Sequence, residues 1–263
     1  MAPLTFGFTP CPNDTFAFHA LVHGLVDTPI RVQPVLLDIE ELNRRAHESA
    51  FDLTKLSVGA FAAVGTRYRL LRSGAALGHG VGPLVVAREP RPLDEAVRGL
   101  VAIPGRETTA FRLLQLAASS LGDVVELRYD RILGAVERGE ADAGLIIHES
   151  RFTYADHGLA KVADLGAWWE AETGLPVPLA GICAHADLDP VVVDAAERAI
   201  RASVAHAFAH PDASRAFVRA HAQEMSDDVC EAHIRLYVND LSLDIGEEGL
   251  RAVARLVSPL RVP

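Results

Sequence analysis

The sequence predicts an α/β protein of two lobes, the second inserted into the first. Short apolar runs alternate with helical patterns through residues 4–184, which is typical of βαβ units and mainly parallel sheets. Two prolines among charged residues at 88–92 and a Gly-Leu-Pro-Val-Pro break at 174–178 mark two chain crossings. Residues 190–257 are almost entirely helical in pattern. A chain of 263 residues is long enough for two such units.

The strands and helices of the first unit are predicted from its apolar runs and from the residues that end those runs. Residues 4–8 predict a strand, which a proline-containing turn at 9–14 connects to a helix over 15–22. Residues 73–82 hold four glycines, so we expect a loop there. Its backbone amides either approach a ligand closely, or the loop is a plain connector. The further strands of this first sheet are expected at 31–37, 52–56, 68–72 and 83–87, and the helices at 39–48 and 58–64.

The second unit begins after residue 92 and repeats this alternation. Its expected strands are 100–103, 124–128 and 141–147, its helices are 110–120 and 132–138, and a strand at 179–184 returns to the first sheet. Four helices, at 191–209, 212–221, 227–238 and 246–257, are expected to cover that sheet. The predicted domains are a larger lobe of residues 1–88 plus 179–263 and a smaller inserted lobe of residues 89–178, with a ligand cleft between them.

Composition restricts the class of partner. Hydrophobic residues make up 49% and charged residues 23%, as in a compact globular protein. The net charge of −10 opposes binding to phosphate backbones or anionic membranes, so we expect neither nucleic acid nor membrane as a partner. The first eight residues lack a signal-peptide pattern and the three cysteines are widely spaced, which favours a cytoplasmic protein. No feature of the sequence indicates an oligomeric state.

His148 is the first candidate for chemistry, because it directly follows the apolar run 143–147. In an open α/β sheet the residue after a strand faces the ligand crevice, and the pKa of imidazole suits a general base. The alternative is a histidine that only caps a turn. Lys55 and Ser57 end another expected strand; Lys55 either pairs with a ligand anion or is a solvated surface lysine.

Thr108 and Thr109 stand at the start of an expected helix, where hydroxyls and free amides hold a carboxylate or serve as ordinary N-caps. Arg106 is open to the same two interpretations as Lys55. The other histidines, His233 among them, fall on helices without metal-binding spacing, so no metal is expected.

Several blocks of residues together resemble a known family. They are 7–16, 54–57, 104–110 and 144–154, with further matches at 71–74, 164–169 and 242–244. In order and spacing they resemble the 1,4-dihydroxy-6-naphthoate synthases of the futalosine route to menaquinone. The resemblance covers nearly the whole chain. It implies a two-lobed fold of the periplasmic-binding-protein type (type II) and a cytosolic carbon–carbon lyase.

The resemblance also implies a reaction and its residues. Members of that family convert cyclic dehypoxanthine futalosine to 1,4-dihydroxy-6-naphthoate and release a sugar-derived fragment, without metal or organic cofactor. His148 matches the proposed general base; Lys55, Leu56, Ser57, Thr109 and Ala110 match ligand-contacting positions, next to Thr108. Two alternatives remain open: chorismate dehydratase of the same pathway, and a non-catalytic binding protein for small carboxylates.

Overall fold

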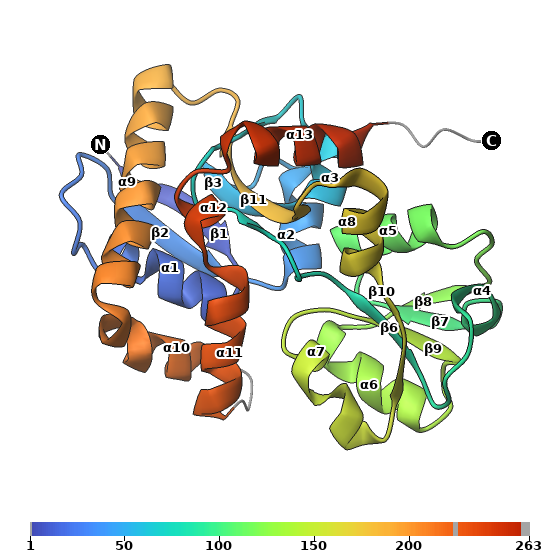
Figure 1. The fold of residues 1–263 in the computed structure, drawn as a ribbon. Coiled ribbons are helices and arrows are strands. Elements are labelled where there is room, and N and C mark those ends of the chain that lie inside the picture. The colour runs from blue at the N-terminus through green and yellow to red at the C-terminus, as the bar shows by residue number, and fades with distance from the viewer. Residues whose placement is uncertain (1, 223–225, 259–263) are drawn as a thin grey trace.

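Two sheets, each flanked by helices, form two lobes in the computed structural model, which describes residues 2–222 and 226–258 (Figure 1). The first sheet has the order β2-β1-β3-β11-β4, with β5 paired to β11; the second has the order β10-β6-β9-β7-β8. The first sheet comprises β1 (Leu4–Phe8), β2 (Val32–Leu36), β3 (Leu53–Ser57), β4 (Tyr68–Leu70), β5 (Ala76–Gly78) and β11 (Val177–His185). The second comprises β6 (Leu84–Ala87), β7 (Val101–Ile103), β8 (Val124–Glu126), β9 (Ala143–Ile146) and β10 (Ala160–Asp164).

The predicted helices agree with the structure within a few residues at most ends, whereas the helices at 93–96, 150–153, 165–173 and 240–243 were not predicted. In the first half of the chain they are α1 (Pro12–Val22), α2 (Ile39–Ala46), α3 (Val58–Val64), α4 (Leu93–Ala96), α5 (Thr109–Ala117) and α6 (Tyr129–Glu137). The second half holds α7 (Ser150–Thr153), α8 (Leu165–Thr173), α9 (Pro190–Ala209), α10 (Arg215–His221), α11 (Asp227–Tyr237), α12 (Asp240–Leu243) and α13 (Gly246–Val257), with short 3-10 helices at Tyr154–His157 and Pro211–Ser214.

Each sheet mixes parallel and antiparallel pairs. β1 is parallel to β2 and β3, and β7 is parallel to β8 and β9, as βαβ units require. β11 runs antiparallel to β3, and β6 runs antiparallel to β9. These two strands follow the crossings between lobes, so each enters its sheet from the opposite end. The expectation of mainly parallel sheets therefore fails at the crossings.

The expectation that residues 83–87 complete the first sheet is wrong. β6 pairs with β9 and β10 in the second sheet, and Val85 and Val86 are fully buried. A strand buried on both faces needs a central place, which the second sheet offers between β9 and β10. The glycine-rich segment is also not a pure loop, because it contains β5.

The predicted lobe boundaries stay a prediction, and we propose to move the first one before Leu84. Gly82 suits the crossing because its φ is +134° and a Cβ there would lie 2.7 Å from the Cα of Gly166. Residues 1, 223–225 and 259–263, which the predicted larger lobe includes, lie outside the described residues.

The core of the larger lobe lies between its sheet and the helices α1 and α9. The rings of Phe6, Phe8 and Phe18 pack there with centroids 5.0 to 5.4 Å apart. Helix α13 departs from the expectation that all C-terminal helices cover the first sheet. Its Val253 and Leu256 share a cluster with Leu113, Trp169 and other residues of the smaller lobe, so α13 helps to join the two lobes (Figure 1).

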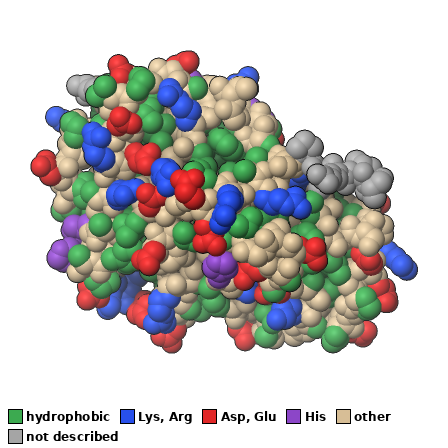
Figure 2. Space-filling model, turned by 45° about the horizontal axis from the view of Figure 1, so that its top comes forward, with side chains coloured by type: hydrophobic (Ala, Val, Ile, Leu, Met, Phe, Trp, Pro, Cys, Tyr) green, Lys and Arg blue, Asp and Glu red, His purple; other side chains and the backbone are tan. Residues whose placement is uncertain are grey.

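The surface carries both signs of charge. On the face in Figure 2, basic and acidic side chains are interspersed over both lobes rather than gathered in one basic patch. Several form exposed ion pairs, such as Arg138 with Glu140 at 2.7 Å. No helix in the described part of the chain is long and apolar enough to cross a membrane.

Candidate active site

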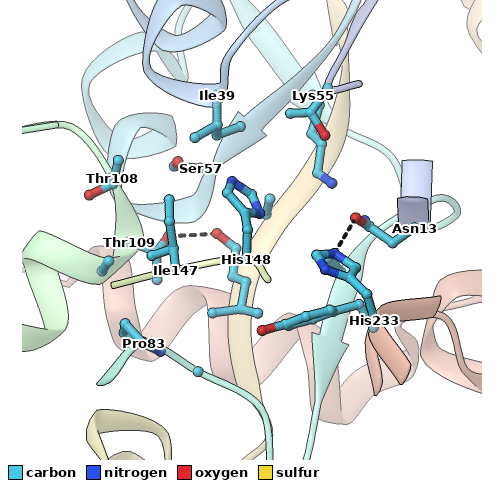
Figure 3. A pocket seen from close by; sticks show the side chains of 17 residues that line it. Asn13, Ile39, Lys55, Ser57, Pro83, Thr108, Thr109, Ile147, His148 and His233 are labelled. Atoms are coloured by element: carbon cyan, nitrogen blue, oxygen red, sulfur yellow. Dashed lines mark hydrogen bonds between the residues drawn. The ribbon is translucent and has the colours of Figure 1, made fainter. Parts of the chain in front are cut away.

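A cleft between the lobes collects the polar residues that end strands and begin helices (Figure 3). The space between its walls, including the open mouth, is about 600 Å³. Segments from both lobes line it, namely Thr9, Asn13, Ile39, Lys55, Ser57, Ala76, Gly82, Pro83, Thr108, Thr109, Ala110, Ile147, His148, Leu179, Ala180, His233 and Tyr237.

His148 lies in this cleft just beyond β9, as the sequence predicts (Figure 3). Its φ is +54°, a left-handed conformation that is uncommon outside glycine and tends to occur at functional sites. The ring packs edge-on against Tyr129, with centroids 4.9 Å apart, and its Nδ1 lies 3.7 Å from the Sγ of Cys11. Its Nε2 is shielded from solvent and has no hydrogen-bond partner among the described residues.

The environment keeps His148 neutral. Burial, and after it the positive charge of Lys55, lowers the pKa of His148 from its ordinary value to about 3. Its imidazole is therefore unprotonated at neutral pH, and a ring nitrogen with a lone pair is what a general base needs.

Lys55 is buried and not a surface lysine: its side chain forms an ion pair with Asp14, which is also buried. The second carboxylate oxygen of Asp14 accepts hydrogen bonds from the Thr9 amide at 3.0 Å and the Thr9 hydroxyl at 2.6 Å. The ammonium group thus has its counterion within the protein.

The hydroxyl group of Ser57 can donate a hydrogen bond to a ligand. Its amide donates to Oδ1 of Asn43 at 3.0 Å, and its Oγ accepts from Nδ2 of the same residue at 3.1 Å. Because the oxygen acts as acceptor toward Asn43, the hydroxyl hydrogen remains available to a ligand.

The two threonines at the start of α5 use their hydroxyls within the protein. Thr108 Oγ1 donates to the Gly105 carbonyl at 2.8 Å and accepts from the Phe111 amide at 3.2 Å, which is ordinary N-capping. Thr109 Oγ1 donates to the Leu179 carbonyl at 2.6 Å and accepts from the Gly59 amide at 3.0 Å. The Thr109 hydroxyl thereby connects α5 of the smaller lobe to β11 and α3 of the larger one.

The amides of α5 remain for a ligand. Those at the start of a helix have no acceptor within it, and the helix dipole favours an anion there. Thr109 and Ala110 provide the first two of these amides and line the cleft. The predicted carboxylate site at this helix therefore rests on its backbone and not on its hydroxyls.

Two predicted residues lie outside the cleft lining. The side chain of Leu56 packs with Tyr68 and Cys183 in a hydrophobic cluster, so only its backbone is close to the site. Arg106 is at the surface and pairs with Glu126 at 2.9 Å.

Sequence reasoning assigned no role to His233, Asn13 or Tyr237, all of which line the cleft. His233 is fully buried on α11, and its ring lies nearly parallel to that of His148 with centroids 6.2 Å apart. A helical histidine without a spacing motif gives no signal in the sequence that it faces a site.

Comparison with known proteins agrees with the resemblance seen in the sequence. The chain is 59% identical to a 1,4-dihydroxy-6-naphthoate synthase of Thermus thermophilus over 97% of this chain and 93% of the relative. It is 42% identical to the enzyme of that name from Streptomyces coelicolor over 97% of this chain and 92% of the relative.

Solved structures support the fold. Protein AF1704 from Archaeoglobus fulgidus matches with a TM-score of 0.91 and 38% identity over 97% of this chain and 95% of that one. The periplasmic aliphatic sulphonate binding protein of Escherichia coli matches with a TM-score of 0.67 and 12% identity over 98% of this chain and 86% of that one, which shows the fold alone. The predicted two-lobed, periplasmic-binding-protein-like fold is confirmed. Since the family model described as menaquinone biosynthesis also matches residues 4–261, the chain belongs to the menaquinone biosynthesis family.

Proposed function

We propose that this chain converts cyclic dehypoxanthine futalosine to 1,4-dihydroxy-6-naphthoate, with His148 as the general base. Synthesis of 1,4-dihydroxy-6-naphthoate for menaquinone is the activity for which both relatives are named, and at 59% identity over 97% of the chain it is the activity of this enzyme. The starting compound and the roles of residues are the proposal.

The observation that carries the base assignment is the unpaired, solvent-shielded Nε2 of neutral His148. We take the ring proton to lie on Nδ1, 3.7 Å from the Sγ of Cys11, so that the lone pair is on Nε2. Nε2 then takes a proton from the substrate, and the carbon–carbon bond to the sugar-derived fragment breaks with its electron pair passing to the ring system. The second ring becomes aromatic, and protonated His148 returns the proton to the product. The cleft contributes by excluding water around the reacting groups.

The proposed anchor for the naphthoate carboxylate is the start of α5. Thr109 and Ser57 lie on the same side of the cleft (Figure 3), and the amides of Thr109 and Ala110 and the hydroxyl hydrogen of Ser57 are the groups that would hold the anion. Lys55 acts differently, because Asp14 already neutralises it.

We further propose that the enzyme works in the cytoplasm. Cys11, Cys183 and Cys230 are all free thiols, which suits a reducing compartment.

The test is direct. Purified protein is incubated with cyclic dehypoxanthine futalosine, and dihydroxynaphthoate is followed by chromatography with mass detection, beside His148→Ala and the surface variant His157→Ala. Loss of a positioned base lowers the rate by about 10² to 10⁴. We expect that loss for His148→Ala and a normal rate for His157→Ala, since His157 pairs only with exposed Glu137.

Two results would contradict the proposal. Near-normal turnover by His148→Ala removes the base assignment. Dehydration of chorismate, or tight binding of the carboxylate without turnover, removes the proposed reaction in favour of the sister enzyme or a binding protein.

A further inference from the structure

His233 is the buried titratable group in the cleft that the proposed reaction leaves unused. It belongs to α11 of the larger lobe and is fully shielded from solvent. One ring nitrogen, Nε2, lies 2.9 Å from Oδ1 of Asn13, as the dashed line in Figure 3 marks. The other, Nδ1, has no partner in the described part of the chain.

The hydrogen bonds around Asn13 determine where the ring proton sits. Nδ2 of Asn13 donates to Oδ1 of Asp14 at 2.8 Å, and a carboxylate only accepts. The amide oxygen of Asn13 must therefore face His233 and accept from its Nε2. Burial and the nearby His148 and Lys55 hold the pKa of His233 well below its usual value, so the ring carries one proton, on Nε2. Nδ1 is left with a lone pair.

Two other histidines, His23 just after α1 and His221 in α10, use Nδ1 differently. Nδ1 of His23 and Nδ1 of His221 each lie 2.9 Å from the carbonyl oxygen four residues earlier. Nδ1 of His233 cannot make this bond, because it holds no proton to donate. A buried acceptor without a partner is rare in folded proteins and calls for an explanation.

The cleft supplies that explanation. Nδ1 of His233 and Nε2 of His148 are both buried and unpaired, and the two rings stack with centroids 6.2 Å apart and planes 19° from parallel. Both residues line the cleft, and Figure 3 shows Thr108 and Thr109, at the start of α5, on the side of His148 that faces away from His233. A ligand complementary to this cleft has an anionic end and, some distance from it, two hydroxyl groups.

We propose that Nδ1 of His233 accepts a hydrogen bond from a substrate hydroxyl and so positions the substrate against Nε2 of His148. The ligand class is a carboxylate that carries at least two hydroxyls, one donating to His233 and one near His148. This inference rests on the proposed function and adds a second substrate-contacting imidazole to it.

Two substitutions separate the nitrogens of the ring. In His233→Gln the amide reaches the position of Nε2, so the bond to Asn13 is kept and the acceptor at Nδ1 is lost. In His233→Asn the shorter amide places an oxygen near Nδ1, so the acceptor is kept and the bond to Asn13 is lost. His221→Gln is the control, because among the described residues its ring bonds the backbone of its own helix.

We expect His233→Gln to lower kcat/KM about 10- to 100-fold, the loss typical of a buried donor, here the substrate hydroxyl, left without its acceptor. Part of the effect should fall on kcat, since misplaced substrate meets the base less often. His233→Asn should retain more activity than His233→Gln, although it breaks the structural bond. A merely structural histidine would show the reverse order, with the melting temperature and activity of His233→Asn falling together. Activity of His233→Gln within twofold of the wild type overturns the proposal.

Nuclear magnetic resonance gives a readout that does not depend on turnover. Long-range ¹H–¹⁵N spectra should show Nδ1 of His233 unprotonated in the free protein, and 1,4-dihydroxy-6-naphthoate should shift that nitrogen. A protonated Nδ1, or no shift at saturating naphthoate, overturns the inference. Failure of the wild type to form naphthoate overturns the proposed function instead, so the two failures are distinguishable.

Discussion

Replacement of Thr109 by valine tests whether its hydroxyl joins the lobes or binds the ligand. The side chain is buried, and valine keeps its shape while it removes the oxygen. That oxygen donates to the Leu179 carbonyl at 2.6 Å and accepts from the Gly59 amide at 3.0 Å. The substitution therefore leaves one acceptor and one donor without a partner.

The expected magnitude follows from those two groups. An unsatisfied buried polar group costs about 1 to 3 kcal/mol, and both backbone groups are only partly buried here, so we expect Thr109→Val to lose about 2 to 4 kcal/mol of unfolding free energy. Thr109→Ser keeps the hydroxyl and removes one methyl group, which costs about 1 kcal/mol.

Urea denaturation followed by circular dichroism measures both free energies at one pH. The reasoning is refuted if Thr109→Val is as stable as Thr109→Ser. If its KM for the substrate also rises by tenfold or more, the hydroxyl contacts the ligand and the α5 amides are not the sole anchor.

The remaining predictions concern charge and exposure. Lys55→Met should destabilise the protein by about 3 to 5 kcal/mol in urea, because Asp14 is left buried and unpaired, and adding Asp14→Asn should recover part of the loss; equal stability of single and double variants would contradict this. The folded-state pKa of His148, about 3, lies below the unfolded value of about 6.5, so the unfolded chain binds more protons between those values and stability falls as pH drops through this window. His148→Gln should therefore flatten the dependence of unfolding free energy on pH, and an unchanged slope would refute the assignment. Burial raises the pKa of Cys11 and Cys183, so Ellman's reagent should modify neither thiol in the native protein and both in urea; rapid native modification would contradict their burial.

Local patterns predicted most elements of the fold because the forces that define them are local. The strand Leu4–Phe8 and the helix Val58–Val64 occur where apolar spacing and flanking polar residues place them. The position of His148 was predictable for the same reason, since the end of an apolar run defines the end of a strand. The threonines of α5 were correctly placed in the cleft, but their hydroxyls turned out to be used as a cap and as a link between lobes.

Contacts between distant residues escaped prediction because their cause is not local. The sequence of β6 is an apolar run that would suit either sheet. Its pairing with β9 and β10 determines that it belongs to the second sheet. In His233, the bond from Nε2 to Asn13 fixes the ring proton and leaves Nδ1 without one. Asn13 lies 220 positions earlier in the chain. The ring of His148, whose backbone is left-handed, likewise contacts Tyr129 and Cys11, which are distant in the sequence.

The ion pair between Lys55 and Asp14 accounts for the direction in which we expect the substrate to bind. An unpaired Lys55 would attract a carboxylate to the end of the cleft that holds both imidazoles, because Coulomb attraction is strong in a dry site. With Asp14 as its counterion, the strongest remaining attraction for an anion is the start of α5. In this orientation the carboxylate lies away from His148, and the reacting hydroxyls lie beside His148. The expected orientation therefore follows from the neutralisation of Lys55 by Asp14.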